Sequence, residues 1–232
     1  MKKLVYIILA GIFFFRSCKD QDKYYKEYVV IGGKTYPGIA LDARANPGRN
    51  RIEIQWLNSA DPTVKKARIY WNNFVDWVDL DIQPDADTIR HIIEELDENT
   101  YSFIIRTIDD KGNFSVPVEV IGNVFGEIYE GSLLNRTIRS SEYDDLTYNL
   151  TINWHNADAS MTGMNLSYTN PEGNPLDIEI DDMSKTSTLL PDFNINHPLV
   201  YYTMHKPDSL AINTFFAREV EKRFTSSIDD DK

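Results

Sequence analysis

The sequence predicts an all-β protein with two similar antiparallel β-sandwiches in tandem. Three observations predict this fold class. The stretch that begins at Ile52 repeats from Leu150 at an offset of 98 residues, and seven of positions 52–82 keep their residue type. Apolar and polar residues alternate within short segments. Turn residues separate these segments at intervals of about 8–12 residues, as in sandwiches.

The first element along the chain is a leader rather than a strand. Met1-Lys2-Lys3 is basic, and residues 4–15 form an uncharged run that ends at Arg16. A run of this length is too short to span a bilayer, which needs about 20 apolar residues. A basic start and a short apolar run are typical of a secretory signal. We therefore expect residues 1–17 to be a signal peptide.

Cys18 is the only cysteine, so no disulfide can form within the chain. The residues "FRSC" resemble a bacterial lipobox, and "CKDQD" resembles the export signal of surface lipoproteins from Bacteroidetes. The resemblance implies that Cys18 carries lipid and that the chain binds the membrane through this anchor. It also implies that residues 18–30 are a tether and that the protein is exposed on the outer membrane.

The charge balance argues against nucleic acid as a partner. The formal net charge is −12, and loss of residues 1–17 removes Lys2, Lys3 and Arg16, which makes it about −15. Such a chain repels phosphate backbones.

The first sandwich is expected over residues 31–126. In "RIEIQW", Ile52, Ile54 and Trp56 alternate with polar residues, which predicts one buried face and one wet face. The pattern continues in segments separated by Asp-, Asn-, Pro- and Gly-containing turns: "KARIYWNN", "WVDLDI", "YSFIIRTID" and "SVPVEVIG". We expect these segments to be strands.

The second sandwich is expected over residues 127–224, after a linker at 126–131. The repeat aligns without a gap, so Trp56 matches Trp154 and Tyr70 matches Tyr168, and the register continues to Val78 over Leu176. A short helix is possible at 217–224, and residues 225–232 are expected to be a disordered tail.

The segment "ELDENTYSFIIRTIDDKGNFS" resembles part of a fibronectin type III domain. Leu96 and Tyr101 take the places of that fold's leucine and tyrosine, and Trp56 takes the place of its tryptophan. The second unit has no clear counterpart, its nearest stretch being "LLPDFNINHPLVYY". The resemblance implies two fibronectin-III-like, immunoglobulin-like sandwiches.

Most of residues 20–220 is similar to a Bacteroidetes lipoprotein family known as domain of unknown function 4998. The resembling pieces are "NRIEIQW", "ARIYWNN", "TYSFIIRTIDDKGNFSV", "LLNR" and "KPDSLAINTFF". Members are typically surface lipoproteins encoded near polysaccharide-uptake systems. The resemblance implies location and fold and assigns no catalytic residues.

No catalytic, metal or cofactor motif stands out. The four histidines lack zinc spacing, and the chain has no G-x-S-x-G and no G-x-G-x-x-G. Carboxylate doublets such as Asp181-Asp182 point to opposite faces of a strand, whereas a glycosidase needs two carboxylates about 5–9 Å apart across one bond. Four aspartates within 79–87 leave calcium open, although the EF-hand glycine is missing. We predict that the protein is not an enzyme and has no cofactor, and we assign no metal-binding residues.

Aromatic residues supply the candidate ligand site. Trp56 and Trp154 alternate with polar residues and are expected in the two cores, whereas Trp71 and Trp77 have no aromatic counterpart in the second unit. An exposed ring beside Asn72 and Asn73 could stack on a sugar and bind its hydroxyls. The alternative is that Trp77 covers the sandwich edge.

These patterns predict a non-catalytic surface module that assists glycan capture near a polysaccharide-uptake system, with glycan and uptake-complex proteins as possible partners. The alternative is a spacer or adhesion stalk that binds protein partners and has no glycan site. A hydrolase would need two convergent carboxylates. A buried Trp77 would favour the stalk.

Overall fold

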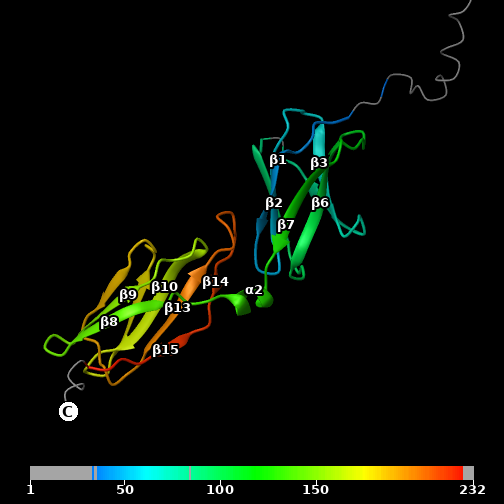
Figure 1. Cartoon of the computed structure of the whole chain (residues 1–232). Coiled ribbons are helices and arrows are strands. Elements are labelled where there is room, and N and C mark those ends of the chain that lie inside the picture. The colour runs from blue at the N-terminus through cyan, green and yellow to red at the C-terminus, as the bar shows by residue number, and fades with distance from the viewer. Residues whose placement is uncertain (1–32, 34–35, 84, 227–232) are drawn as a thin grey trace, which may run out of the picture. The chain divides into compact units, whose positions relative to one another are not determined.

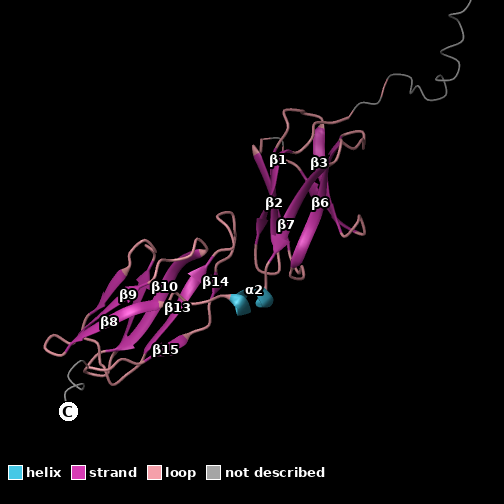
Figure 2. Cartoon of the chain, viewed as in Figure 1, coloured by secondary structure: helices cyan, strands magenta, loops and turns pink. Residues whose placement is uncertain are grey.

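The computed structural model describes residue 33, residues 36–83 and residues 85–226. The chain divides into two units, residues 1–36 and residues 37–232. Strands dominate the larger unit (Figure 1; Figure 2). The all-β prediction is confirmed. The expected signal peptide, the tether with Cys18 and most of the expected C-terminal tail lie outside the described residues.

The first sandwich contains two antiparallel sheets. One has the strand order β1-β2-β5 and the other has the order β4-β3-β6-β7. The strands are β1 (Leu41–Pro47), β2 (Ile52–Leu57), β3 (Val64–Trp71), β4 (Asp76–Asp81), β5 (Thr88–Ile93), β6 (Asn99–Asp109) and β7 (Val118–Val124).

The core of the first sandwich follows the period of two. Ile52, Ile54 and Trp56 of β2 are almost completely buried. They pack in one cluster with side chains from the other sheet, among them Ile69 and Phe103. Burial of each such side chain contributes roughly 1.5–3 kcal/mol, so the alternation in "RIEIQW" defines the inner face.

Leu96 and Tyr101 lie as the fibronectin resemblance implies. Leu96 is buried in the first core. The hydroxyl of Tyr101 donates a hydrogen bond to the carbonyl of Asp97 at 3.0 Å, which is the contact of a tyrosine corner.

The second sandwich repeats this plan. Its sheets have the orders β12-β9-β8 and β11-β10-β13-β14, and β15 also pairs with β13. The strands are β8 (Ile138–Asp144), β9 (Asn149–Trp154), β10 (Met161–Thr169), β11 (Pro175–Ile180), β12 (Ser187–Leu190), β13 (Leu199–His205), β14 (Phe215–Phe216) and β15 (Val220–Lys222).

Trp154, Leu150 and Ile152 fill the second core as Trp56 and its neighbours fill the first. The second sandwich also buries Arg136, whose Nε and Nη1 donate to the carbonyls of His155 and Lys185 at 2.8 and 2.9 Å. Burial lowers the pKa of Arg136. Arg136 therefore satisfies carbonyl groups at the ends of two strands.

The expected linker is helical. Helix α2 (Glu127–Ser132) follows β7 directly. The Glu98 carboxylate accepts hydrogen bonds from the backbone N–H groups of Ile128 and Tyr129, both at 2.8 Å. It supplies the acceptor that the first turn of a helix lacks. Arg49 donates to the Glu130 carboxylate at 2.7 Å, and its guanidinium lies 4.9 Å from the centre of the Phe215 ring.

Two expectations about the second sandwich are wrong. The segment 217–224, where a short helix was expected, contains strand β15 instead, since residues 220–222 pair with β13. The gapless repeat is correct for β2 and β9 but fails at β3 and β10. Strand register matches Val64 with Met161 and Ile69 with Leu166, an offset of 97, because the preceding loop is one residue shorter.

Candidate functional site

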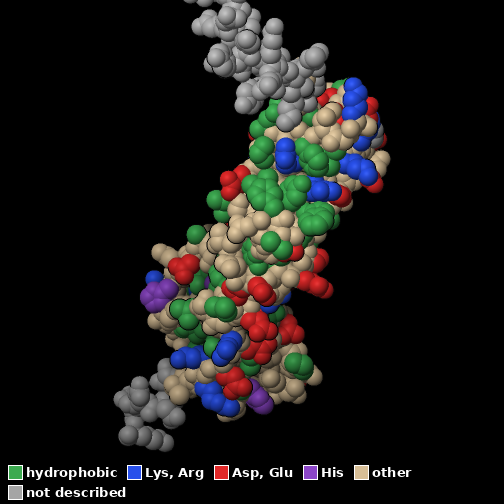
Figure 3. Space-filling model, turned by 90° about the vertical axis from the view of Figure 1, so that its right-hand side faces the viewer, with side chains coloured by type: hydrophobic (Ala, Val, Ile, Leu, Met, Phe, Trp, Pro, Cys, Tyr) green, Lys and Arg blue, Asp and Glu red, His purple; other side chains and the backbone are tan. Residues whose placement is uncertain are grey.

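The sheet β4-β3-β6-β7 has one face in the core and one face in solvent. Because side chains alternate along a strand, every second residue of each strand points away from the core. We call these residues the outer face: Lys66, Arg68, Tyr70, Trp77, Asp79, Asp81, Thr100, Ser102, Ile104, Arg106, Ile108, Glu119, Ile121 and Asn123. Hydrophobic and basic side chains lie side by side on the first sandwich (Figure 3).

Trp77 is the most prominent aromatic residue of the outer face. Its side chain is 54% exposed. It lies directly across from Tyr70, which in turn lies across from Ile104 on β6. The ring of Phe74, from the β3–β4 turn, is 5.2 Å from that of Tyr70. Three aromatic rings and an isoleucine therefore line one end of the face.

Arg68 lies in the next row, two residues along the strand. Its Nε and Nη2 donate to the two oxygens of Asp79 at 2.5 and 2.7 Å. Its guanidinium is also 5.7 Å from the ring centres of Tyr70 and Trp77 and 5.8 Å from that of Phe114, within the range of a cation–π contact. The hydrogen bond to Asp79 raises the pKa of Arg68 and lowers the pKa of Asp79.

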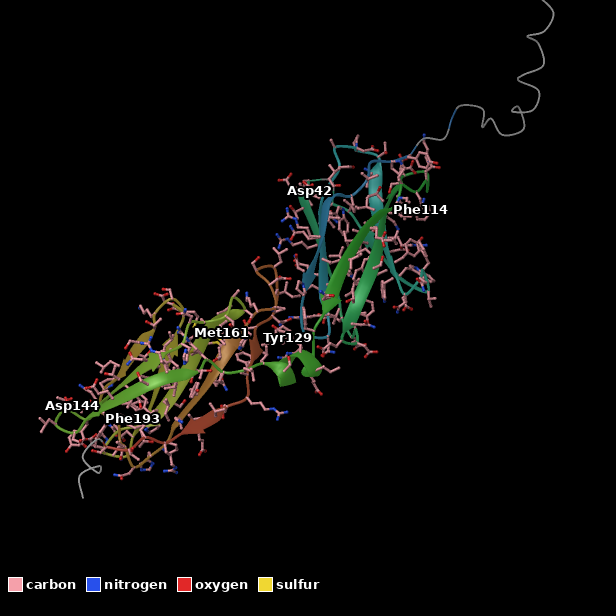
Figure 4. All side chains as sticks on the ribbon, in the orientation of Figure 1. Asp42, Phe114, Tyr129, Asp144, Met161 and Phe193 are labelled. Atoms are coloured by element: carbon pink, nitrogen blue, oxygen red, sulfur yellow. The ribbon has the colours of Figure 1, made fainter. Side chains whose placement is uncertain are left out.

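Arg106 stands directly across from Arg68. Its Nε donates to the carbonyl of Ser115 at 3.0 Å, and its guanidinium lies 5.0 Å from the centre of the Phe114 ring. Phe114 is labelled on the first sandwich in Figure 4. In the part of the chain that the structure describes, Arg106 makes no ion pair. The outer face thus places two guanidinium groups side by side and pairs one of them.

The β3–β4 turn brings two of the sequence candidates to the edge of this face. Asn72 and Asn73 have left-handed backbones, with φ of 49° and 54°, as does Phe74 at 67°. Asparagine tolerates this conformation better than most residues. The Asn72 side chain donates to the Asp76 carboxylate at 2.6 Å, so it supports the turn.

The structure separates Trp71 from the other candidates. Trp71 packs against the hydrophobic core of the first sandwich. It follows Tyr70 directly, so it points to the other side of the sheet. Trp71 therefore does not share a face with Trp77, although both lack an aromatic partner in the repeat.

Sequence reasoning missed Tyr70, Arg68, Arg106 and Phe114. The alternation in "KARIYW" was a usable signal for Arg68 and Tyr70. Both alternate with the apolar Ala67 and Ile69, so both point away from the core. No comparable signal exists for Arg106, since its position depends on which residues of β3 and β6 are paired.

Of the four histidines, His91 lies on β5 and His205 on β13, outside the outer face, and two of the aspartates within 79–87 form ion pairs. His91 is half-buried and His205 is buried, and burial lowers the pKa of both. Asp79 and Asp81 pair with Arg68 and Lys66. Among the described residues, no three histidine, cysteine or acidic side chains gather as a metal site would require.

Open hollows lie on the second sandwich, among the described residues. One, of about 540 Å³, is lined by residues from 131–137 and 218–222 together with Tyr201. It is open and mixes apolar with charged groups. An aromatic row on a sheet is flat, so it forms no cavity and suits an extended ligand rather than an enclosed one. Among the described residues, no helix is long and apolar enough to cross a membrane.

The solved structures that match this chain include tandem fibronectin type III domains. The chicken CNTN1 FN1–FN3 domains match with 14% identity and a TM-score of 0.42, and the match covers 81% of this chain and 65% of that one. A two-domain fibronectin type III segment of chicken tenascin matches with 14% identity and a TM-score of 0.31, over 80% of this chain and 98% of that one. No curated protein matches.

Each sandwich has the strand order of a fibronectin type III-like domain. A three-stranded sheet faces a larger sheet, which contains β4-β3-β6-β7 in the first sandwich and β11-β10-β13 in the second. The sequence profile of one family, described as a domain of unknown function, matches residues 18–215. The chain therefore belongs to the family known as domain of unknown function 4998.

Proposed function

We propose that this protein is a non-catalytic, lipid-anchored module of the outer-membrane surface that captures extracellular glycan beside a polysaccharide-uptake system. The ligand lies on the outer face of the first sandwich. The exposed Trp77, set in a row with Tyr70 and Ile104, is the observation that carries the proposal.

A flat ring suits a sugar because the C–H groups of one sugar face are apolar while its rim carries hydroxyls. An indole that is 54% exposed can bury its face against such a ring, and this burial is favourable at roughly 25 cal/mol per Å². Polar groups that could bind hydroxyls are close to the row, among them Asn73 in the turn and Ser102 and Glu119 on β6 and β7. This combination of apolar surface and a few polar groups is typical of ligand sites.

The experiment is affinity electrophoresis of residues 19–232, which include the whole compact unit 37–232, through gels that contain plant, host or microbial polysaccharides. We expect at least one polymer to retard the protein and Trp77→Ala to abolish the retardation. Trp77→Phe should keep part of it, because a smaller ring remains.

Tyr148→Ala is the matched control, since Tyr148 is 51% exposed on the second sandwich. This variant should migrate as the unmodified protein does. Absence of retardation by every polymer would contradict the proposal and would favour the stalk, with a protein as the ligand. Retardation that persists in Trp77→Ala would move the site away from the outer face.

A further inference from the structure

The outer face carries an unusual arrangement of charge. The chain has a formal net charge of −12, yet Arg68 and Arg106 lie directly across from each other on β3 and β6. Like charges in this position destabilise a sheet. Asp79 pairs with Arg68, and among the described residues no acidic side chain pairs with Arg106. On the outer face, Lys66 and Arg68 each have an acidic partner, and Arg106 is left without one.

The acidic groups around Arg106 are engaged elsewhere. Glu119, on the neighbouring strand, accepts a hydrogen bond from the hydroxyl of Ser102 at 2.6 Å. Asp109, three residues along β6, accepts hydrogen bonds from Lys111 and Asn113 and holds the β6–β7 turn. Asp79 is bound at both oxygens by Arg68.

Arg106 is also held in a defined orientation. Nε is fixed by the Ser115 carbonyl at 3.0 Å, and one side of the guanidinium lies against Phe114. A guanidinium has five N–H donors, and the Nη groups of Arg106 have no protein partner among the described residues. Such a preorganised fork binds a planar carboxylate through two parallel hydrogen bonds. Arg68 and Asp79 already form this pair beside aromatic rings on the same face.

We propose that the ligand of the outer face is an acidic polysaccharide whose uronic acid carboxylate binds Arg106 while a neighbouring sugar stacks on Trp77. This inference rests on the proposed function and specifies its ligand class. Arg106 lies two strands and two residues away from Trp77, so their Cα atoms are about 12 Å apart by ordinary sheet geometry. A short run of linked sugars spans that distance.

The test compares polygalacturonate with the same polymer after full methyl esterification, which keeps the sugar and removes the charge. Affinity electrophoresis of residues 19–232 is run with a chelator, so that calcium cannot bridge polymer and protein. We expect polygalacturonate to bind at least tenfold more tightly than its ester, and Arg106→Gln to lose about tenfold or more of that affinity, as expected for charged hydrogen bonds. Arg106→Lys should lose less, because it keeps the charge without the fork.

Arg139→Gln is the control, since Arg139 is exposed on β8 of the second sandwich. It should bind polygalacturonate normally. Thermal unfolding of Arg106→Gln checks that the variant is folded. If Arg106→Gln leaves polygalacturonate binding intact, the inference is overturned, and a binding equal for dextran sulfate and polygalacturonate would overturn the preference for carboxylate.

The two proposals fail separately. Binding of the ester or of neutral polymers that depends on Trp77 but not on Arg106 would keep the glycan module and overturn the acidic ligand. No binding by any polymer would overturn both.

Discussion

The two sandwiches have the same frame and different outer faces. Strand register matches Trp56 with Trp154 in the two cores, and it matches Thr107 of β6 with Thr203 of β13, both buried. On the outer face the match ends. The pair Tyr70–Trp77 of the first sandwich corresponds to Ser167–Asp177 of the second, joined by a hydrogen bond between the two side chains.

The positions of the two guanidinium groups differ as well. Arg68 and Arg106 of the first sandwich correspond to Asn165 and Tyr202 of the second. The corresponding face of the second sandwich therefore carries an aromatic residue, Tyr202, whose ring centre lies 5.8 Å from that of Phe216. The residue across from Tyr202 is Asn165 rather than an arginine. The comparison teaches that the repeat specifies the interior, and that the exposed indole and the two facing guanidinium groups belong to the first sandwich.

The largest effect should come from the shared interior. Trp56→Ala and Trp154→Ala each remove a fully buried indole and should each cost about 3–5 kcal/mol of unfolding free energy. Hydrogen exchange resolved by mass spectrometry measures the two sandwiches separately. Each variant should lose protection mainly in its own sandwich. A loss under about 1 kcal/mol in either would mean that the two cores are not equivalent.

A smaller effect should separate the two tryptophans. The Nε1 of Trp154 donates to the hydroxyl of Thr188 at 3.0 Å, whereas the buried Nε1 of Trp56 has no hydrogen-bond partner among the described residues. Replacement by phenylalanine removes a hydrogen bond only from the second sandwich. We therefore expect Trp154→Phe to cost about 1 kcal/mol more than Trp56→Phe. Trp154→Phe/Thr188→Val is the control, because it removes both partners of the hydrogen bond. Equal losses of unfolding free energy in Trp154→Phe and Trp56→Phe, by the same measurement, would contradict the assignment.

A pH difference should distinguish two corresponding positions. His205 is paired with Met161 as Asp109 is paired with Val64. His205 is buried, Ser160 Oγ lies 3.0 Å from its Nδ1, and burial lowers its pKa below the ordinary value of about 6.5. Below that value the unfolded chain binds a proton that the folded chain refuses, so stability is full above about pH 6.5 and falls as the pH drops toward the folded pKa.

Asp109 has a lowered pKa because the Asn113 side chain donates to its carboxylate, so its contribution is lost only at more acid pH, below about 4. Hydrogen exchange between pH 7.5 and 5 should thus show the β13 region losing protection, and His205→Gln should make this loss smaller. The β6 turn should be steady over the same range. An unchanged pH dependence of β13 in His205→Gln would assign the effect to another group.

The sequence was sufficient where one strand decides the outcome. Period two in "RIEIQW" correctly predicted which residues face inward, and the resemblance to a fibronectin type III domain implied the places that Leu96 and Tyr101 take. It was insufficient where loop lengths decide. The four-residue turn between Trp71 and Asp76 corresponds to seven residues between Tyr168 and Leu176. The loop before β10 is also one residue shorter than the loop before β3, so a gapless alignment matched the half-buried Tyr70 with the buried Tyr168. The alignment could not show that Arg106 lies beside Arg68.

The smallest effect on stability, and the sharpest use of the comparison, is to transfer the site. Ser167→Tyr with Asp177→Trp would place an aromatic pair across β10 and β11, where the first sandwich has Tyr70 and Trp77. Because these positions are partly or fully exposed, unfolding free energy should change by no more than about 1 kcal/mol. In a background of Trp77→Ala, affinity electrophoresis should show weak retardation by neutral polymers, without the preference for uronate that Arg106 supplies. Full recovery of uronate binding would show that an aromatic pair on any such sheet is enough, and that the guanidinium row contributes nothing.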